Sequence, residues 1–184
     1  MTEEPLSADA GEMSTTRYVS DREAATTRLA ARIATVAERG DVLALEGPLG
    51  AGKTVFARGF IRALTGADEE VPSPTFTLVQ IYDCAAGPVY HFDLYRIEAP
   101  DELYELGIEE AFAEGIALIE WPERARALQN ERWLTVVFAI ESGPAETRSL
   151  ALRPGAAWKA RLEKLNLAGI EAARDRPPVT DRHD

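Results

Sequence analysis

The chain has 184 residues and a formal net charge of −11, with 46% hydrophobic and 28% charged residues, a composition that suits one globular domain with a sizeable core. The excess of acidic residues argues against tight, non-specific binding to DNA or RNA, which depends on Lys and Arg neutralising phosphates. The sequence has no apolar run near the ~20 residues that cross a bilayer and no secretory signal. Cys84 is the only cysteine, which excludes an intramolecular disulfide framework. We therefore expect a cytoplasmic protein with no membrane partner.

The first half of the chain predicts two strand–helix units. Residues 1–13 are polar and lack periodicity, which is typical of a disordered leader. A short strand is expected at 15–19, followed by a helix whose apolar residues recur at helical spacing up to Gly40. The run 41–46 is continuously apolar, as in buried parallel strands. It precedes a second helix, whose predicted buried face carries Phe56, Phe60, Ala63 and Leu64.

The second half predicts two hairpins around a further buried strand. Pro72 and Pro74 exclude regular helix from the segment that contains them. The remaining elements are expected to be strands at 78–82, 89–92, 116–119, 133–140 and 147–152, and helices at 100–106, 109–114, 123–128 and about 155–165. This order predicts an α/β fold of three layers, with a mixed, mainly parallel central sheet flanked by helices. We expect the domain to span 14–168 and a flexible tail to follow at 169–184.

A glycine-rich loop follows the strand predicted at 41–46. It fits the pattern Gly-x-x-x-x-Gly-Lys-Thr at every specified position, between an apolar strand and an amphipathic helix. Its glycines let successive N–H groups turn toward one anion, Lys53 can place an ammonium on the phosphates, and the Thr54 hydroxyl can ligate Mg²⁺. The sequence therefore predicts a P-loop NTPase fold that binds ATP and Mg²⁺ through Gly47, Pro48, Leu49, Gly50, Ala51, Gly52, Lys53, Thr54 and Val55.

Two acidic residues are candidates for the metal site, which needs a carboxylate at the end of a neighbouring strand. Glu120 ends the apolar run 116–119, and Asp93 ends the less apolar strand at 89–92. One carboxylate can serve Mg²⁺ while the other orients the attacking water. A structural role is open for each, because Glu120 could cap the helix that starts at Pro122 and Asp93 could be a turn residue.

Other polar and aromatic residues near these motifs have competing interpretations. Ser73 and Thr75 lie on a proline-stiffened loop, where a hydroxyl can sense the γ-phosphate or simply stabilise a rigid turn. Trp121 adjoins Glu120 and can approach the nucleotide or pack in the core. His91 is expected to be a packed residue rather than a base. Arg124 and Arg126 could reach phosphate, but a solvated helix face is the expected position for both.

Four motifs in this order resemble the TsaE (YjeE) family, over about residues 15 to 153. They are Glu46-Gly47-Pro48-Leu49-Gly50-Ala51-Gly52-Lys53-Thr54, Pro72-Ser73-Pro74-Thr75-Phe76, His91-Phe92-Asp93-Leu94-Tyr95-Arg96 and Glu120-Trp121-Pro122-Glu123. Together they are far more specific than the P-loop alone.

The resemblance implies an ATPase needed to make threonylcarbamoyladenosine in tRNA. Such a protein acts on the TsaD–TsaB complex, hydrolyses ATP to ADP and phosphate with low activity in the absence of these partners, and meets tRNA only indirectly. No DNA partner is implied. The resemblance assigns the catalytic roles to Lys53, Asp93, Glu120 and Thr75, the metal ligands to Thr54, Glu120 and Asp93, and a place near the nucleotide to Trp121.

Two other functions use the same phosphate loop. A small-molecule kinase would add a second substrate pocket, and a non-catalytic module would use its nucleotide only to lock a protein interface. A GTPase is disfavoured, because the sequence has no Asn-Lys-x-Asp segment to read guanine.

Overall fold

The computed structural model describes residues 16–20, 22–141, 147–165 and 167. The predicted leader at 1–13, the turn of the last hairpin and the tail at 169–184 lie outside the described residues. The predicted domain limits therefore stay predictions.

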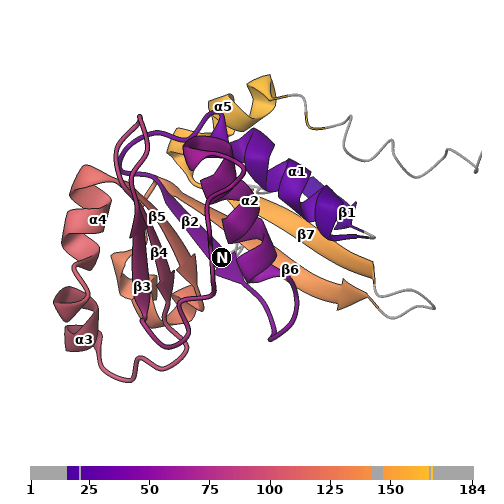
Figure 1. Cartoon of the computed structure of the whole chain (residues 1–184). Coiled ribbons are helices and arrows are strands. Elements are labelled where there is room, and N and C mark those ends of the chain that lie inside the picture. Colours follow the sequence, from indigo (N-terminus) through magenta and orange to yellow (C-terminus); the bar gives the residue numbers. More distant parts are fainter. Residues whose placement is uncertain (1–15, 21, 142–146, 166, 168–184) are drawn as a thin grey trace, which may run out of the picture.

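A mixed sheet forms the centre of the described part of the chain (Figure 1). Its strands, in the order β1-β7-β6-β2-β5-β4-β3, are Thr16–Ser20, Thr147–Pro154, Trp133–Glu141, Val42–Glu46, Ile116–Glu120, Val89–Asp93 and Val79–Tyr82. The four central strands β6, β2, β5 and β4 pair in parallel, and β1, β7 and β3 add antiparallel pairings at the two sides. The predicted α/β fold with a mixed sheet is confirmed, and its parallel part contains the apolar runs at 42–46 and 116–120.

Helices cover both faces of this sheet (Figure 1). Helices α1 (Glu23–Ala34), α2 (Lys53–Thr65) and α5 (Ala156–Lys164) bury residues in one apolar layer, where Phe56 meets the Phe138 ring edge-on at 5.8 Å between centroids. Helices α3 (Pro100–Glu105), α4 (Ile108–Glu114) and the 3₁₀ helix η1 (Pro122–Leu128) cover the other face. The two layers explain why β2 and β5 are apolar on both sides.

Some predicted details of the helices are wrong. The first helix ends at Ala34 rather than near Gly40. The helix expected at 123–128 is present, as the 3₁₀ helix η1. Ala63 is exposed, and Ile61 is buried instead. The buried stripe is shifted because α2 packs on α1 as well as on the sheet: a Cβ at Gly59 would lie 2.9 Å from the Cα of Thr27.

The parallel strands end together at one edge of the sheet. Asp93 is the last residue of β4 and pairs in register with Glu120, the last residue of β5, which in turn pairs with Leu45 of β2. The glycine-rich loop starts directly after β2. The fold thus brings the glycine-rich loop, Asp93 and Glu120 to the same edge, where α/β sheets commonly bind ligands. Within the described ranges, no helix has the length and apolar content that a membrane span requires.

Candidate functional site

The loop at 47–54 has the backbone shape of a phosphate cradle. Gly47 has φ 147°, and a Cβ there would lie 2.6 Å from the Phe138 carbonyl oxygen, so only glycine fits. Gly52 is the N-cap of α2 in the left-handed region, with φ 100°. The first N–H groups of α2 consequently point out of the helix at the loop, where unpaired donors and the helix dipole favour an anion.

Lys53 lies beneath this loop and is 4% exposed. Its Nζ donates hydrogen bonds to the carbonyl oxygens of Gly47 at 2.7 Å and Pro48 at 2.9 Å, and it lies 4.0 Å from the centroid of the Trp121 ring. Burial lowers the pKa of the Lys53 ammonium, while the nearby carboxylates of Glu120 and Asp93 act in the opposite direction. The ammonium is therefore held at the loop by neutral partners, which an anion with full negative charge would outcompete.

Glu120 joins the loop to the strand β4. Its Oε1 accepts a hydrogen bond from the Thr54 hydroxyl at 2.8 Å and lies 3.0 Å from Nε2 of His91. Glu120 is 3% exposed. Because the hydroxyl proton of Thr54 is committed to Glu120, the lone pairs of the Thr54 oxygen stay available to a metal ion. The structure does not show Glu120 as a cap of η1, whose N-cap residue is Trp121 without a side-chain cap.

Asp93 is engaged by the proline-stiffened loop. Its Oδ2 accepts a hydrogen bond from the Thr75 hydroxyl at 3.1 Å, and its Oδ1 accepts one from the backbone N–H of Tyr95 at 3.0 Å. The hydroxyls of Thr75 and Ser73 lie 2.8 Å apart. The residue predicted as a switch hydroxyl therefore touches one of the two candidate carboxylates directly.

Trp121 has a strained backbone at the point where β5 ends. Its φ is 59°, in the left-handed region that non-glycine residues rarely adopt, at a cost of order 1–3 kcal/mol. Its ring packs against the Tyr95 ring at 4.9 Å between centroids and against the ammonium of Lys53. The ring closes one wall of the site.

These side chains surround a cavity of about 260 Å³. The predicted site residues that line it are Leu49, Gly50, Gly52, Lys53, Thr54, Val55, Thr75, Asp93, Glu120 and Trp121. The remaining predicted residues, Gly47, Pro48 and Ala51, belong to the loop but do not line the cavity; the first two hold Lys53 through their carbonyls.

Other lining residues escaped the sequence analysis. Glu23 and Thr26 come from α1, and Arg148 comes from β7 and lies over the start of α2, since a Cβ at Gly52 would be 3.6 Å from its Cδ. Arg126 is not at this cavity but pairs with Glu46 at 2.9 Å, on an exposed surface as expected. No local sequence pattern marks Glu23, Thr26 and Arg148 as site residues, because the folding of distant segments brings them to the loop.

The donor set suits Mg²⁺ bound together with a phosphate. The described residues contain no group of three His, Cys, Asp or Glu side chains that could hold a metal ion by themselves. Mg²⁺ does not need such a group, because it prefers hard oxygen ligands and is commonly bound by one or two carboxylates, waters and the phosphates of its substrate. Thr54, Glu120 and Asp93 supply oxygen at the cavity wall.

Comparison with known proteins finds a matching family and a similar solved structure. The family model described as threonylcarbamoyl adenosine biosynthesis protein TsaE matches residues 20–150, more than half of the chain. A crystal structure of Bacillus subtilis YdiB is similar to this fold, with a TM-score of 0.68 and 27% identity over 85% of this chain and 97% of that chain.

Curated relatives carry the same name, tRNA threonylcarbamoyladenosine biosynthesis protein TsaE. The protein of Rickettsia felis is 43% identical over 105 residues, 57% of this chain and 61% of the relative. That of Bacillus subtilis is 47% identical over 97 residues, 52% of this chain and 60% of the relative. That of Treponema pallidum is 36% identical over 67% of this chain and 91% of the relative. The chain spans 58 to 61% of the length of the relatives from Rickettsia felis, Rickettsia conorii, Rickettsia prowazekii and Rickettsia typhi.

Proposed function

We propose that this chain, which belongs to the TsaE family of threonylcarbamoyl adenosine biosynthesis proteins, binds ATP with Mg²⁺ at its glycine-rich loop and hydrolyses it to ADP and phosphate. The proposal includes the process in which the curated relatives are named, the formation of threonylcarbamoyladenosine in tRNA.

One observation carries the proposal: a single cavity collects the phosphate loop, a buried ammonium and two buried carboxylates. Lys53, Asp93 and Glu120 are 4%, 5% and 3% exposed, and all three line the same cavity with Thr54. Burying charged side chains costs free energy unless partners compensate. A buried cation and buried anions around an anion cradle are typical of a site completed by a phosphate and a metal ion.

Each residue has a distinct role in this proposal. The loop amides and Lys53 bind the phosphates, and the ammonium balances charge that develops as the terminal phosphate departs. Thr54 and Glu120 would hold Mg²⁺, which would supply positive charge to the phosphate oxygens. Asp93, fixed by Thr75 and the Tyr95 amide, is placed to orient the attacking water. Thr75 lies on the loop that follows α2, where Ser73 and Phe76 are exposed. Its contact with Asp93 therefore connects the cavity with a surface loop.

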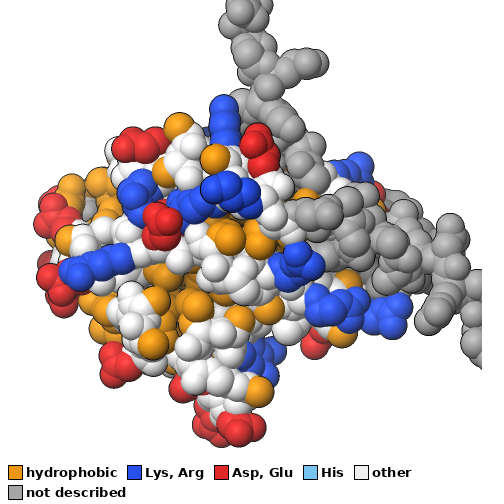
Figure 2. Space-filling model, turned by 90° about the horizontal axis from the view of Figure 1, so that it is seen from above, with side chains coloured by type: hydrophobic (Ala, Val, Ile, Leu, Met, Phe, Trp, Pro, Cys, Tyr) orange, Lys and Arg blue, Asp and Glu red, His pale blue; other side chains and the backbone are white. Residues whose placement is uncertain are grey.

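The proposal names TsaD and TsaB as partners and tRNA as an indirect one. The net charge of −11 disfavours strong contact with a phosphate backbone. The face seen from above displays Lys and Arg side chains separated by carboxylates and apolar groups rather than a continuous basic surface (Figure 2). The partners would therefore make the main tRNA contacts. The sequence leads us to expect this protein in the cytoplasm.

The test is ATP hydrolysis by the full chain, alone and with TsaD and TsaB. We expect slow release of phosphate by the chain alone, faster release with both partners, and none when Lys53→Ala replaces the wild type. ATP binding without turnover beside both partners would contradict hydrolysis and favour a non-catalytic module. A phosphorylated metabolite formed in place of free phosphate would favour a kinase.

A further inference from the structure

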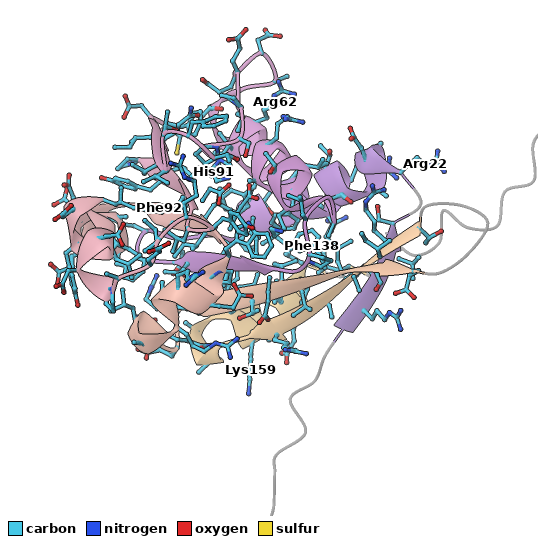
Figure 3. All side chains as sticks on the ribbon, turned by 90° about the horizontal axis from the view of Figure 1, so that it is seen from below. Arg22, Arg62, His91, Phe92, Phe138 and Lys159 are labelled. Carbon is cyan, nitrogen blue, oxygen red and sulfur yellow. The ribbon has the colours of Figure 1, made fainter. Side chains whose placement is uncertain are left out.

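His91 lies in the middle of β4 and is completely buried, with 0% exposure. Its neighbour Phe92 belongs to the apolar layer beneath α3 and α4, so His91 points to the opposite face, toward α2 (Figure 3). Val89, two residues earlier on the same face, packs in the apolar core. Because the same face of β4 buries the apolar Val89, burial on this face does not by itself require an imidazole.

The imidazole has a specific polar contact in Glu120. Nε2 of His91 lies 3.0 Å from Oε1, the same oxygen that accepts the hydrogen bond from the Thr54 hydroxyl. A carboxylate oxygen accepts, so the ring nitrogen at this distance is the donor. With two donors on Oε1, the second oxygen of Glu120 is the one best placed to face a metal ion or its water.

The other ring nitrogen supports a role beyond stability. Nδ1 is buried and has no hydrogen-bond partner among the residues that the structure describes. A buried polar atom without a partner costs about 1–3 kcal/mol. The tautomer with a proton on Nε2 keeps this cost lowest, because it leaves no unpaired N–H at Nδ1. The fold therefore retains a side chain that disfavours folding at one atom and holds Glu120 at the other.

We propose that His91 is a positioning residue, which fixes the Glu120 carboxylate through Nε2–H and so sets how tightly the nucleotide binds when Mg²⁺ is present. The inference rests on the proposed function, because it assigns Glu120 to the metal. Groups that orient metal ligands in this way typically contribute about 10-fold to 100-fold in metal affinity. His91 does not line the cavity, so it acts only through Glu120.

The test measures the dissociation constant of ADP by calorimetry, once with MgCl₂ and once with EDTA. The readout is the constant in EDTA divided by the constant with MgCl₂, which is the factor by which Mg²⁺ tightens ADP binding. We expect His91→Phe, which keeps a ring but donates no hydrogen bond, to reduce the Mg²⁺-dependent ratio at least about tenfold. ADP binding in EDTA should stay near the wild-type value. His91→Gln places an amide N–H near the former Nε2 and should restore most of the ratio. His91→Leu, which also lacks a donor, should repeat the Phe result.

Val89→Ala is the matched control, because it loosens the same face of β4 without touching Glu120. It should lower the melting temperature and leave the ratio unchanged. The inference is overturned if the donor-free variants keep the wild-type ratio, or if Val89→Ala or His91→Gln reduces it as much as they do. A wild-type chain that binds no ADP under either condition would overturn the proposed function as well, so the two failures are distinguishable.

Discussion

Two clusters of buried charged side chains lie at opposite ends of β2, and they differ in how completely their charges are paired. At the start of the strand, Asp41 is 0% exposed and accepts hydrogen bonds from both terminal nitrogens of Arg161, at 2.6 and 2.9 Å. Arg132 approaches the same carboxylate at 3.1 Å, and the backbone N–H of Glu38 donates to it at 2.7 Å. Asp41 in turn raises the pKa of the Arg161 guanidinium.

The cluster beyond the other end of β2 is incompletely paired. Lys53 is held by two backbone carbonyls and an aromatic ring, and it forms no direct ion pair within the described residues. Each cluster contains one buried nitrogen without a partner within the described residues, Nδ1 of His91 here and Nε of Arg132 in the first cluster. The difference lies in the charged groups, because burial lowers the pKa of Lys53 whereas Asp41 raises that of Arg161. Removing one partner of a buried ion pair is strongly destabilising because it leaves an uncompensated charge, whereas a buried charge whose close partners are neutral is a candidate for binding a charged ligand.

The largest effect that would test this contrast is expected at Asp41. Asp41→Ala removes the carboxylate between Arg161 and Arg132 and should lower the free energy of unfolding by about 3 kcal/mol, the low end for breaking buried ion pairs, since Arg132 is partly exposed. Urea denaturation measures the change. Asp83→Ala, at an exposed position between β3 and β4, should stay within about 0.5 kcal/mol of wild type. Equal effects of the two substitutions would remove the contrast.

Lys53→Ala should produce the opposite pattern. Loss of one charge-assisted contact of about 1.5–3 kcal/mol should weaken MgATP binding roughly 10-fold to 100-fold in calorimetry. The free energy of unfolding should fall by about 1 kcal/mol or less, because the ammonium has neutral partners and its charge is disfavoured by burial. Lys159 projects from the outer surface of α5 (Figure 3), so Lys159→Ala should bind like wild type. Unchanged MgATP affinity of Lys53→Ala would contradict the role assigned to the cluster.

A smaller difference should separate the two carboxylates of the cavity. Glu120→Gln should reduce the Mg²⁺-dependent part of ADP binding about tenfold, and Asp93→Asn should reduce it less. The reason is that Glu120 contacts the Thr54 hydroxyl, whereas Asp93 is engaged by Thr75 and the Tyr95 amide. Neither substitution should destabilise the fold as much as Asp41→Ala. The reverse order in calorimetry would give the metal to Asp93.

Local pattern was enough to predict the elements that form the cavity. The apolar runs at 41–46 and 116–119 suit buried strands and correspond to β2 and β5, and the glycines that follow the first run identify the loop. Because parallel strands end at one edge, the same patterns placed Glu120 and Asp93 near Lys53. Their roles toward ATP and Mg²⁺ stay predictions.

Long-range packing could not be predicted in the same way. Arg148 and Thr26 reach the cavity from β7 and α1, and neither lies in a motif. His91 was expected to be packed, which it is, but its contact with Glu120 depends on the register between β4 and β5. Ala63 was placed in the core because helical periodicity ignores the second surface that α1 offers to α2.

The most direct test of the central claim is the free energy of unfolding of the full chain, measured against MgATP concentration. If the incompletely paired cluster is completed by MgATP, the folded state should gain about 2.7 kcal/mol at 100 times the dissociation constant. Lys53→Ala at the same MgATP concentration should gain clearly less. A wild-type free energy of unfolding that does not change over the whole range of MgATP would contradict the claim.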